Sequence, residues 1–192
     1  MKKKTRTCRY LCLILLLAMP AMKSQAQMLG VKTNALGWGA WGSMNLGVEV
    51  GFARQWSAEV SAIYNPFAWK ENKKTNLWGV QPEVRFWPRH KFAGHFVGIH
   101  GHYAQYDWGV KTYVYKGDLF GVGASYGYAL MLAKRWNLEG TVGFGFNRLR
   151  HDAIFIRKEG PLSQVPYYSE NKWGLTKAGI TITYFINTTR KP

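Results

Sequence analysis

Acidic residues and cysteines are scarce in this chain of 192 residues. Asp and Glu number 10 against 26 Lys and Arg, which gives a formal net charge of +16. The only cysteines, Cys8 and Cys12, lie near the N-terminus, so the rest of the chain has no disulfide, thiol nucleophile or thiolate metal site. Aromatic residues make up 16% of the chain and glycines number 21, a composition that excludes a disordered chain and a coiled coil.

The N-terminal segment has the features of a cleaved secretory signal. A cationic start, Met1–Arg6, precedes an apolar run, Leu11–Ala18, that is too short to span a bilayer because a spanning helix needs about 20 apolar residues. Ser24-Gln25-Ala26 fits the small-x-small cleavage pattern. We therefore expect residues 1–26 to be a signal peptide that is cut before Gln27, and residues 27–192 to form one domain.

Removal of this segment changes the charge of the chain and the classes of protein that fit it. The segment carries six cations and no acidic residue, so the net charge falls from +16 to +10. No run of 18 apolar residues follows Gln27, and no transmembrane helix is expected. Export removes nucleic acid as a target, and no helix is predicted that could enter a groove, so we expect no nucleic-acid partner.

After the signal segment, large apolar residues alternate with small or polar residues at a period of two. In residues 43–53, Met44, Leu46 and Val48 alternate with small or polar residues that include Glu49. Such alternation predicts a strand whose two faces differ. A soluble sandwich places long Lys and Glu side chains on its solvent face, whereas a narrow barrel in lipid needs small or mutually paired residues inside.

The alternation predicts eight strands with connections of two kinds. Short ones near residues 54–55, 89–91 and 134–135 alternate with long ones at 66–76, 107–117 and 149–171, and the turn near Trp41-Gly42 is an exception. Short periplasmic turns and long outer loops are typical of outer-membrane barrels. We therefore expect an all-β fold, an eight-stranded antiparallel up-and-down transmembrane β-barrel in the outer membrane with both termini in the periplasm. The predicted strands are 29–40, 43–53, 56–65, 77–88, 94–106, 118–132, 136–148 and 172–186.

Trp56, Trp87 and Trp136 each lie beside a short connection that carries Lys or Arg. Tryptophan at headgroup depth next to cations is typical of the aromatic belt of membrane barrels. We expect these three residues to form such a belt at the turns.

The last predicted strand resembles the terminal-strand signal that the barrel-insertion machinery reads. The signal has the pattern polar, x, Gly, x, x, apolar, x, aromatic. The resemblance implies that this machinery is a partner during assembly. The matching residues are Lys177, Gly179, Ile182 and Tyr184.

Five motifs in order resemble an uncharacterised family known as domain of unknown function 3575. The resemblance covers nearly all of the chain after the signal segment and implies a small outer-membrane barrel. It implies no catalytic residue and no cofactor, and its context suggests a link to envelope integrity or surface-fibre assembly. The motifs are Lys32-Thr33-Asn34, Asn45-Leu46-Gly47-Val48-Glu49, Tyr64-Asn65-Pro66-Phe67, Gln81-Pro82-Glu83-Val84-Arg85 and Gly94-His95-Phe96-Val97-Gly98-Ile99-His100.

Charged residues on the polar faces of the predicted strands are expected to meet in the lumen. An eight-stranded barrel has an interior that side chains just fill, so these charges must be paired. We expect a salt-bridged network that fills the lumen and includes Lys32. The alternative is an ion or proton pathway, or acid–base catalysis by two of the glutamates. Pairing across the short turns sets Glu59 near Gly51, Arg85 near Phe96 and Gln81 near His100. The predicted network comprises Glu49, Glu59, Glu83, Arg85, His100, His102, Glu139 and Lys177.

Two other kinds of site have weaker support. The spacing of His100-Gly101-His102 can chelate a metal, but Glu83 is the one evident third ligand and Arg85 beside it repels cations, so no metal is expected. A lipid-modifying enzyme could use a serine, a histidine and an aspartate, but these lie on different elements and no G-x-S-x-G elbow exists. The candidates are Ser125, His102, His151 and Asp107.

The sequence therefore favours a non-catalytic barrel with a filled lumen and a structural or surface-interaction role. Basic, tyrosine-rich loops, such as 70–74 and 148–168, suit contacts with phosphates of lipopolysaccharide or with a surface protein. The main alternative is an acyltransferase or deacylase that acts on envelope lipid. A soluble ligand-binding barrel is a third class.

Overall fold

The structure is a computed structural model that describes residues 28–65, 68–69, 73–110, 113–156, 163–165 and 168–186. The predicted signal peptide and its cleavage site lie outside these residues. The elements are β1 (Leu29–Asn34), α2 (Ala35–Trp41), β2 (Met44–Gly51), β3 (Trp56–Asn65), β4 (Ala68–Trp69), β5 (Lys73–Phe86), β6 (Gly94–Val110), β7 (Tyr113–Ala133), β8 (Trp136–Ile156), β9 (Ser163–Val165) and β10 (Tyr168–Phe185).

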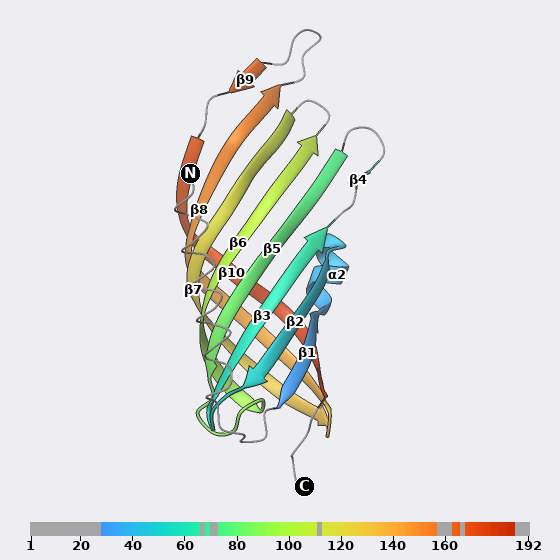
Figure 1. Cartoon of the computed structure of the whole chain (residues 1–192), viewed down its shortest axis with the longest axis vertical. Coiled ribbons are helices and arrows are strands. Elements are labelled where there is room, and N and C mark those ends of the chain that lie inside the picture. Colours follow the sequence, from blue (N-terminus) through green and yellow to red (C-terminus); the bar gives the residue numbers. More distant parts are fainter. Residues whose placement is uncertain are drawn as a thin grey trace, which may run out of the picture.

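Eight of the strands form a closed antiparallel up-and-down barrel (Figure 1). Barrel strands that follow one another along the chain are paired, and β10 pairs with both β8 and β1, which closes the sheet. The short strands β4 and β9 pair only with the outer parts of β5 and β8. The predicted eight-stranded all-β fold is confirmed. Within the described residues, no helix has the length and hydropathy needed to cross a membrane.

The barrel wall is much taller on one side than on the other. β1 has 6 residues and β2 has 8, whereas β7 and β8 have 21 each. We call the end with the short connections the turn end, and the opposite end the loop end; the turn end is at the bottom of Figure 1. All eight strands meet at the turn end, and β5, β6, β7, β8 and β10 continue beyond the others towards the loop end.

Several strands reach further towards the loop end than the sequence predicted. β6 runs to Val110 and β7 begins at Tyr113, so most of the connection predicted at 107–117 is strand. β8 likewise runs to Ile156, well beyond its predicted end. Alternation marks only the part of a strand whose two faces differ, whereas pairing depends on backbone hydrogen bonds that the side-chain pattern does not reveal.

The second half of the first predicted strand, 29–40, is wrong, because the chain leaves the sheet as α2. The Asn34 side chain caps this helix by accepting a hydrogen bond from the Leu36 backbone N–H at 3.1 Å. Gly42 ends it with a left-handed backbone, φ 59°. These two capping residues, together with the loss of alternation between them, were the signal for a helix.

Strand pairing differs from the predicted register by two residues at both turns that were considered. The connections, residues 52–55 and 87–93, are longer than predicted, and this moves the register. A shift of two residues keeps every side chain on its face, so the predicted faces hold although the partners change. The observed pairs are Glu49 with Glu59, Gly98 with Arg85, and His100 with Glu83.

The polarity of the two faces is the reverse of that in a soluble barrel. Charged side chains such as Lys32, Glu49 and Arg85 point inward and are at most 2% exposed. Large apolar side chains point outward, and Ile99 and Leu46 are 75% and 60% exposed. The barrel therefore presents an apolar outer surface around a polar lumen.

Candidate functional site

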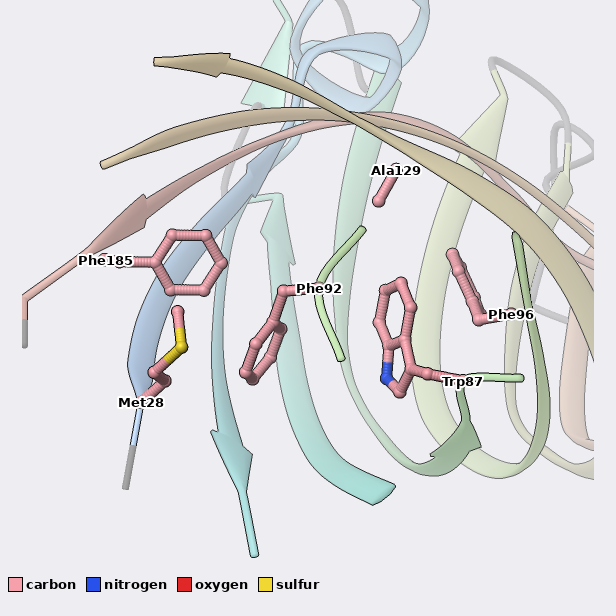
Figure 2. Packing of buried hydrophobic residues seen from close by; sticks show 6 residues of the cluster. All are labelled: Met28, Trp87, Phe92, Phe96, Ala129 and Phe185. Carbon is pink, nitrogen blue, oxygen red and sulfur yellow. The ribbon is translucent and has the colours of Figure 1, made fainter. Parts of the chain in front are cut away.

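An aromatic plug fills the turn end of the lumen (Figure 2). The Trp87 ring lies 4.7 Å from the Phe96 ring and 5.8 Å from the Phe92 ring, and Phe92 is 5.0 Å from Phe185, measured between centroids. Phe92 lies in the β5–β6 connection and has a left-handed backbone, φ 64°, that is uncommon for a bulky residue. Its buried ring covers the lumen from the connection. The plug comprises Met28, Trp87, Phe92, Phe96, Ala129 and Phe185.

The place of Trp87 in this plug overturns its assignment to the aromatic belt. Trp87 is fully buried, and its indole Nε1–H donates to Ser57 Oγ at 2.9 Å. It has the same parity as Glu83 and Arg85, so the alternation already placed it inside the barrel. Trp56 and Trp136 do point outward at the turn end.

A network of buried ion pairs lies directly above the plug. The Lys32 ammonium on β1 contacts carboxylates from three strands, Glu49 at 2.7 Å, Glu59 at 3.0 Å and Glu139 at 2.8 Å. Glu49, Glu59 and Glu83 face one another on neighbouring strands. Like charges directly opposite one another destabilise a sheet, so these strands need cations from elsewhere in the barrel.

Arg85 lies at the centre of this network and contacts all four of its carboxylates. Its guanidinium nitrogens lie 3.2 Å from Glu49, 2.5 Å from Glu59, 3.2 Å from Glu83 and 3.0 Å from Glu139. Its Cζ also lies 4.5 Å from the centroid of the Phe96 ring, which joins the network to the plug.

Lys177 and several hydroxyl groups complete the network. The Lys177 ammonium bridges Glu59, at 3.3 Å, and Glu83. Ser125 Oγ donates to Glu83, and Thr141 Oγ1 donates to Glu139 at 3.0 Å. Ser57 Oγ, which accepts from Trp87, donates in turn to Glu49 at 2.5 Å.

Three cations thus oppose four carboxylates, and the network has a formal charge of −1. Its members are nearly all buried, and such charges are tolerated only when their geometry and hydrogen bonds satisfy them. The structure joins Lys32 and six of the eight predicted network residues by ion pairs, whereas the two histidines bond to other partners. Sequence reasoning missed Ser57 and Thr141, which have the inward parity of their strands but no charge to single them out.

The two histidines bond to groups outside the ion network, although His100 lies opposite Glu83 on the neighbouring strand. His100 Nε2 lies 2.9 Å from Thr176 Oγ1, and His102 Nε2 lies 2.8 Å from Asn147 Oδ1. Their ring centroids are 6.1 Å apart. Among the described residues, no group of three or more His, Cys, Asp or Glu side chains could hold a metal ion.

The residues considered for a lipid-modifying enzyme do not form one site. Ser125 donates to Glu83, and His102 faces Asn147. His151 Nδ1 lies 2.8 Å from the Tyr106 hydroxyl, and Asp107 lies 3.6 Å from the Lys116 ammonium. The hydrogen bonds of Ser125, His102 and His151 given above are thus with other groups and do not form a serine–histidine pair.

A cavity of about 260 Å³ lies above the network. Lys32, Glu59 and Lys177 form part of its wall on the network side. Ser61 and Gln81 line it from β3 and β5, and residues from α2, β2 and β10 line its other side.

The predicted insertion signal lies on β10, where its residues alternate between the two faces. Lys177 and Gly179 face the lumen, and Ile182 and Tyr184 lie on the outer face. The Tyr184 ring packs against Trp136 with centroids 5.0 Å apart. The terminal pattern is thus part of the wall rather than of a tail.

These features define the protein as a small closed barrel with an apolar outer surface and an ion-paired lumen. The chain belongs to a family described as protein of unknown function (DUF3575), which matches residues 11–186. The family resemblance seen in the sequence motifs is therefore confirmed. No curated protein and no solved structure gives a significant match.

Proposed function

We propose that the protein is a non-catalytic outer-membrane barrel that contributes to the structure or surface interactions of the envelope. The observation that carries this proposal is the reversed polarity, with buried charges inside and large apolar side chains outside. Extended exposed apolar surfaces mark membrane or protein contacts. Because the apolar side chains are distributed around the barrel rather than on one side, lipid is the environment that fits them.

The dimensions of the strands support a membrane crossing with an external extension. With 3.3 Å per residue and a tilt of about 40°, the 21 residues of β8 rise about 50 Å, roughly twice the apolar band of about 25 Å in membrane barrels. The tall strands therefore reach well beyond the membrane at the loop end. Both described ends of the barrel, at β1 and β10, lie at the turn end, which fits periplasmic termini.

The outer face of β8 changes from apolar to basic along this rise. Phe144 is exposed on the outer face, and Arg148 and Arg150 follow on the same face. Arginine binds phosphate through two parallel hydrogen bonds. These residues suit contacts with lipopolysaccharide phosphates just outside the apolar band, and the tall strands and loops beyond them suit a surface protein partner.

The test combines gel mobility with a charge placed on the outer face. Folded protein in detergent should migrate differently before and after boiling. Ile99 lies five residues into β6, about 13 Å from the turn end and near the expected midplane. Ile99→Arg should cost about 2–4 kcal/mol in the free energy of unfolding in lipid, whereas Leu132→Arg, on the outer face near the turn end, should cost at most about 1 kcal/mol. Coincident lanes, solubility without detergent, or equal costs would refute the membrane placement.

A lipid-modifying enzyme is the second candidate, because the Thr176 hydroxyl lies 2.9 Å from His100 Nε2 beside the cavity. A nucleophile next to a base is one requirement for acyl transfer. The base also needs a group that orients it, and His100 Nδ1 has no hydrogen-bond partner among the described residues. Mass spectra of envelope lipids from a deletion strain separate the candidates, since a non-catalytic barrel leaves acylation unchanged.

A further inference from the structure

The barrel wall is interrupted where β1 ends. The β1–β10 ladder stops at Asn34 opposite Thr181, and the β1–β2 ladder stops at Lys32 opposite Gly47. Beyond these pairs, α2 takes the place of the strand, beside the upper ends of β1 and β2 (Figure 1). The Asn34 side chain donates to the Ala178 carbonyl and accepts from the Ile180 N–H, which bridges the start of this interruption.

The rim of the interruption is apolar. α2 has the sequence Ala-Leu-Gly-Trp-Gly-Ala-Trp and carries no charge. Leu36 and Trp38 are exposed on the helix, and Trp38 is 52% exposed. Leu46 on β2 and Ile180 on β10 are exposed on either side of it. An alkyl chain could therefore lie on this rim without meeting a charged side chain of the helix.

The cavity lies immediately inside this interruption. Its lining includes Gly37, Asn45 and Thr181. These residues belong to α2, β2 and β10, the three elements that border the interruption. Ser61 and Gln81 line it from the neighbouring wall. Its volume of about 260 Å³ is slightly below the roughly 300 Å³ at which pockets for drug-sized ligands begin, so it suits a small head group.

The charges beside the cavity favour a neutral, hydroxyl-bearing group over an ion. The charged groups on the cavity wall, Lys32, Glu59 and Lys177, are already paired within the network, so an anion would lose its water without gaining an unpaired cation. A cation would face Lys177, the network residue that is most exposed, at 12%. Hydroxyl groups both donate and accept, which matches the hydroxyl and amide groups of Ser61, Gln81 and Thr181.

We propose that this cavity binds the neutral, hydroxyl-bearing head group of a single-chain amphiphile, whose alkyl chain leaves through the interruption and lies on Leu36 and Trp38. The proposal rests on the proposed function, because the surrounding lipid supplies the ligand and solvates the rest of its chain. Monoacylglycerol is the probe that represents this class.

The experiment uses the full chain folded in lipid vesicles and a monoacylglycerol with a photoreactive group in its alkyl chain. Labelling should concentrate on the peptides that contain α2 and Ile180. Unlabelled monoacylglycerol should compete, whereas a fatty acid and an alkylamine of the same chain length should compete much less. If the probe labelled α2 from a non-specific position on the outer surface, the neutral and the charged amphiphiles would compete equally well.

Two variants fill or alter the cavity, and a third variant serves as a matched control. Ala104→Phe places a ring in the cavity, and Gln81→Leu removes a polar group from its wall. Ala124→Phe makes the same change on the outer face of β7. Labelling in Ala104→Phe should fall about tenfold, which corresponds to about 1.4 kcal/mol of binding free energy, and it should stay unchanged in Ala124→Phe.

Gel mobility before and after boiling separates the two proposals. Wild-type protein that fails this test contradicts the membrane barrel itself. The cavity proposal alone is refuted if the wild-type protein shows the gel shift but is labelled uniformly along the chain. It is also refuted if the fatty acid or the alkylamine competes with the label as well as monoacylglycerol does. Should Ala104→Phe lose its gel shift, Gln81→Leu decides, and equal labelling of a folded Gln81→Leu variant and the wild type would overturn the proposal.

Discussion

Replacement of Arg85 by methionine tests whether the ion network holds the barrel together. Methionine keeps an unbranched side chain in the lumen but removes the guanidinium that contacts four carboxylates. Lys32 and Lys177 alone then oppose these carboxylates, so the formal charge of the network changes from −1 to −2. The contact of the guanidinium with the Phe96 ring is lost as well.

The expected loss is large relative to the stability of a typical domain. Removal of one partner from a buried ion pair costs about 3–5 kcal/mol, because the remaining charge is left without compensation. Folded proteins are stable by about 5–15 kcal/mol, so Arg85→Met removes a substantial part of this reserve. Glu139→Gln leaves three cations and three carboxylates, and we expect it to cost only about 2 kcal/mol, the contribution of hydrogen bonds to a charged group.

Urea unfolding of the protein in lipid vesicles, followed by tryptophan fluorescence, measures these free energies. Arg135→Met is the matched control, since Arg135 is exposed at the β7–β8 turn and its one described side-chain hydrogen bond, at 3.2 Å, is to the Tyr184 hydroxyl. Its loss should stay below about 1 kcal/mol. A stabilising role of Arg85 in the network is refuted if Arg85→Met costs no more than Arg135→Met, or if Glu139→Gln costs as much as Arg85→Met.

Three further substitutions test the plug, a lumen glycine and the helix cap by the same unfolding assay. Trp87→Ala should cost about 3–5 kcal/mol, since a fully buried ring leaves a cavity. Gly127→Ala should lower the unfolding midpoint because the new Cβ meets the Phe96 ring, whereas Gly140→Ala, with open space around its Cβ, should leave it unchanged. Asn34→Ala should cost at least about 1 kcal/mol, because it removes the α2 cap together with the two hydrogen bonds to β10, and unchanged stability would show that these contacts of Asn34 are dispensable.

The strands and their faces could be predicted from the sequence because alternation is a local property. Each residue between Met44 and Gly51 shows its face by its own polarity, and the structure agrees. Strand pairing is set by turn geometry. The sequence did not indicate the full length of the connections at residues 52–55 and 87–93, so the predicted pairing was displaced. Towards the end of β8 the outer face carries the exposed Arg148 and Arg150 in place of large apolar residues, so alternation of polarity no longer marks where the strand ends.

The meeting of charges in the lumen was predictable, but its geometry was not. Inward parity and the narrow interior placed Glu49, Glu59 and Arg85 together. The central position of Arg85 depends on strand stagger around the barrel, a property of the whole sheet. Trp87 shows how a local motif can mislead, since its neighbourhood of cations suggested a belt while its parity placed it in the plug.

The network also explains how the barrel fixes its register. A slip of one residue is blocked because it would turn the buried charges onto the apolar outer face of the barrel, but a slip of two residues keeps every side chain on its face. Such a slip moves side chains about 7 Å along a strand, which breaks the contacts of 2.7–3.0 Å that Lys32 makes. The network therefore discriminates between registers that the apolar surface accepts equally.

If the network fixes the register, loss of Arg85 should loosen the pairing between β2 and β3. The outward residues Val48 and Val60 are paired, and a slip of two residues would bring Val48 opposite Ala62. Cysteine pairs at these positions report the register by oxidation, with Cys8 and Cys12 replaced by serine. In the otherwise wild-type barrel, only the 48–60 pair should cross-link, whereas the Arg85→Met variant should also cross-link the 48–62 pair. Cross-linking confined to the 48–60 pair in both proteins would show that turns and outward packing set the register without the network.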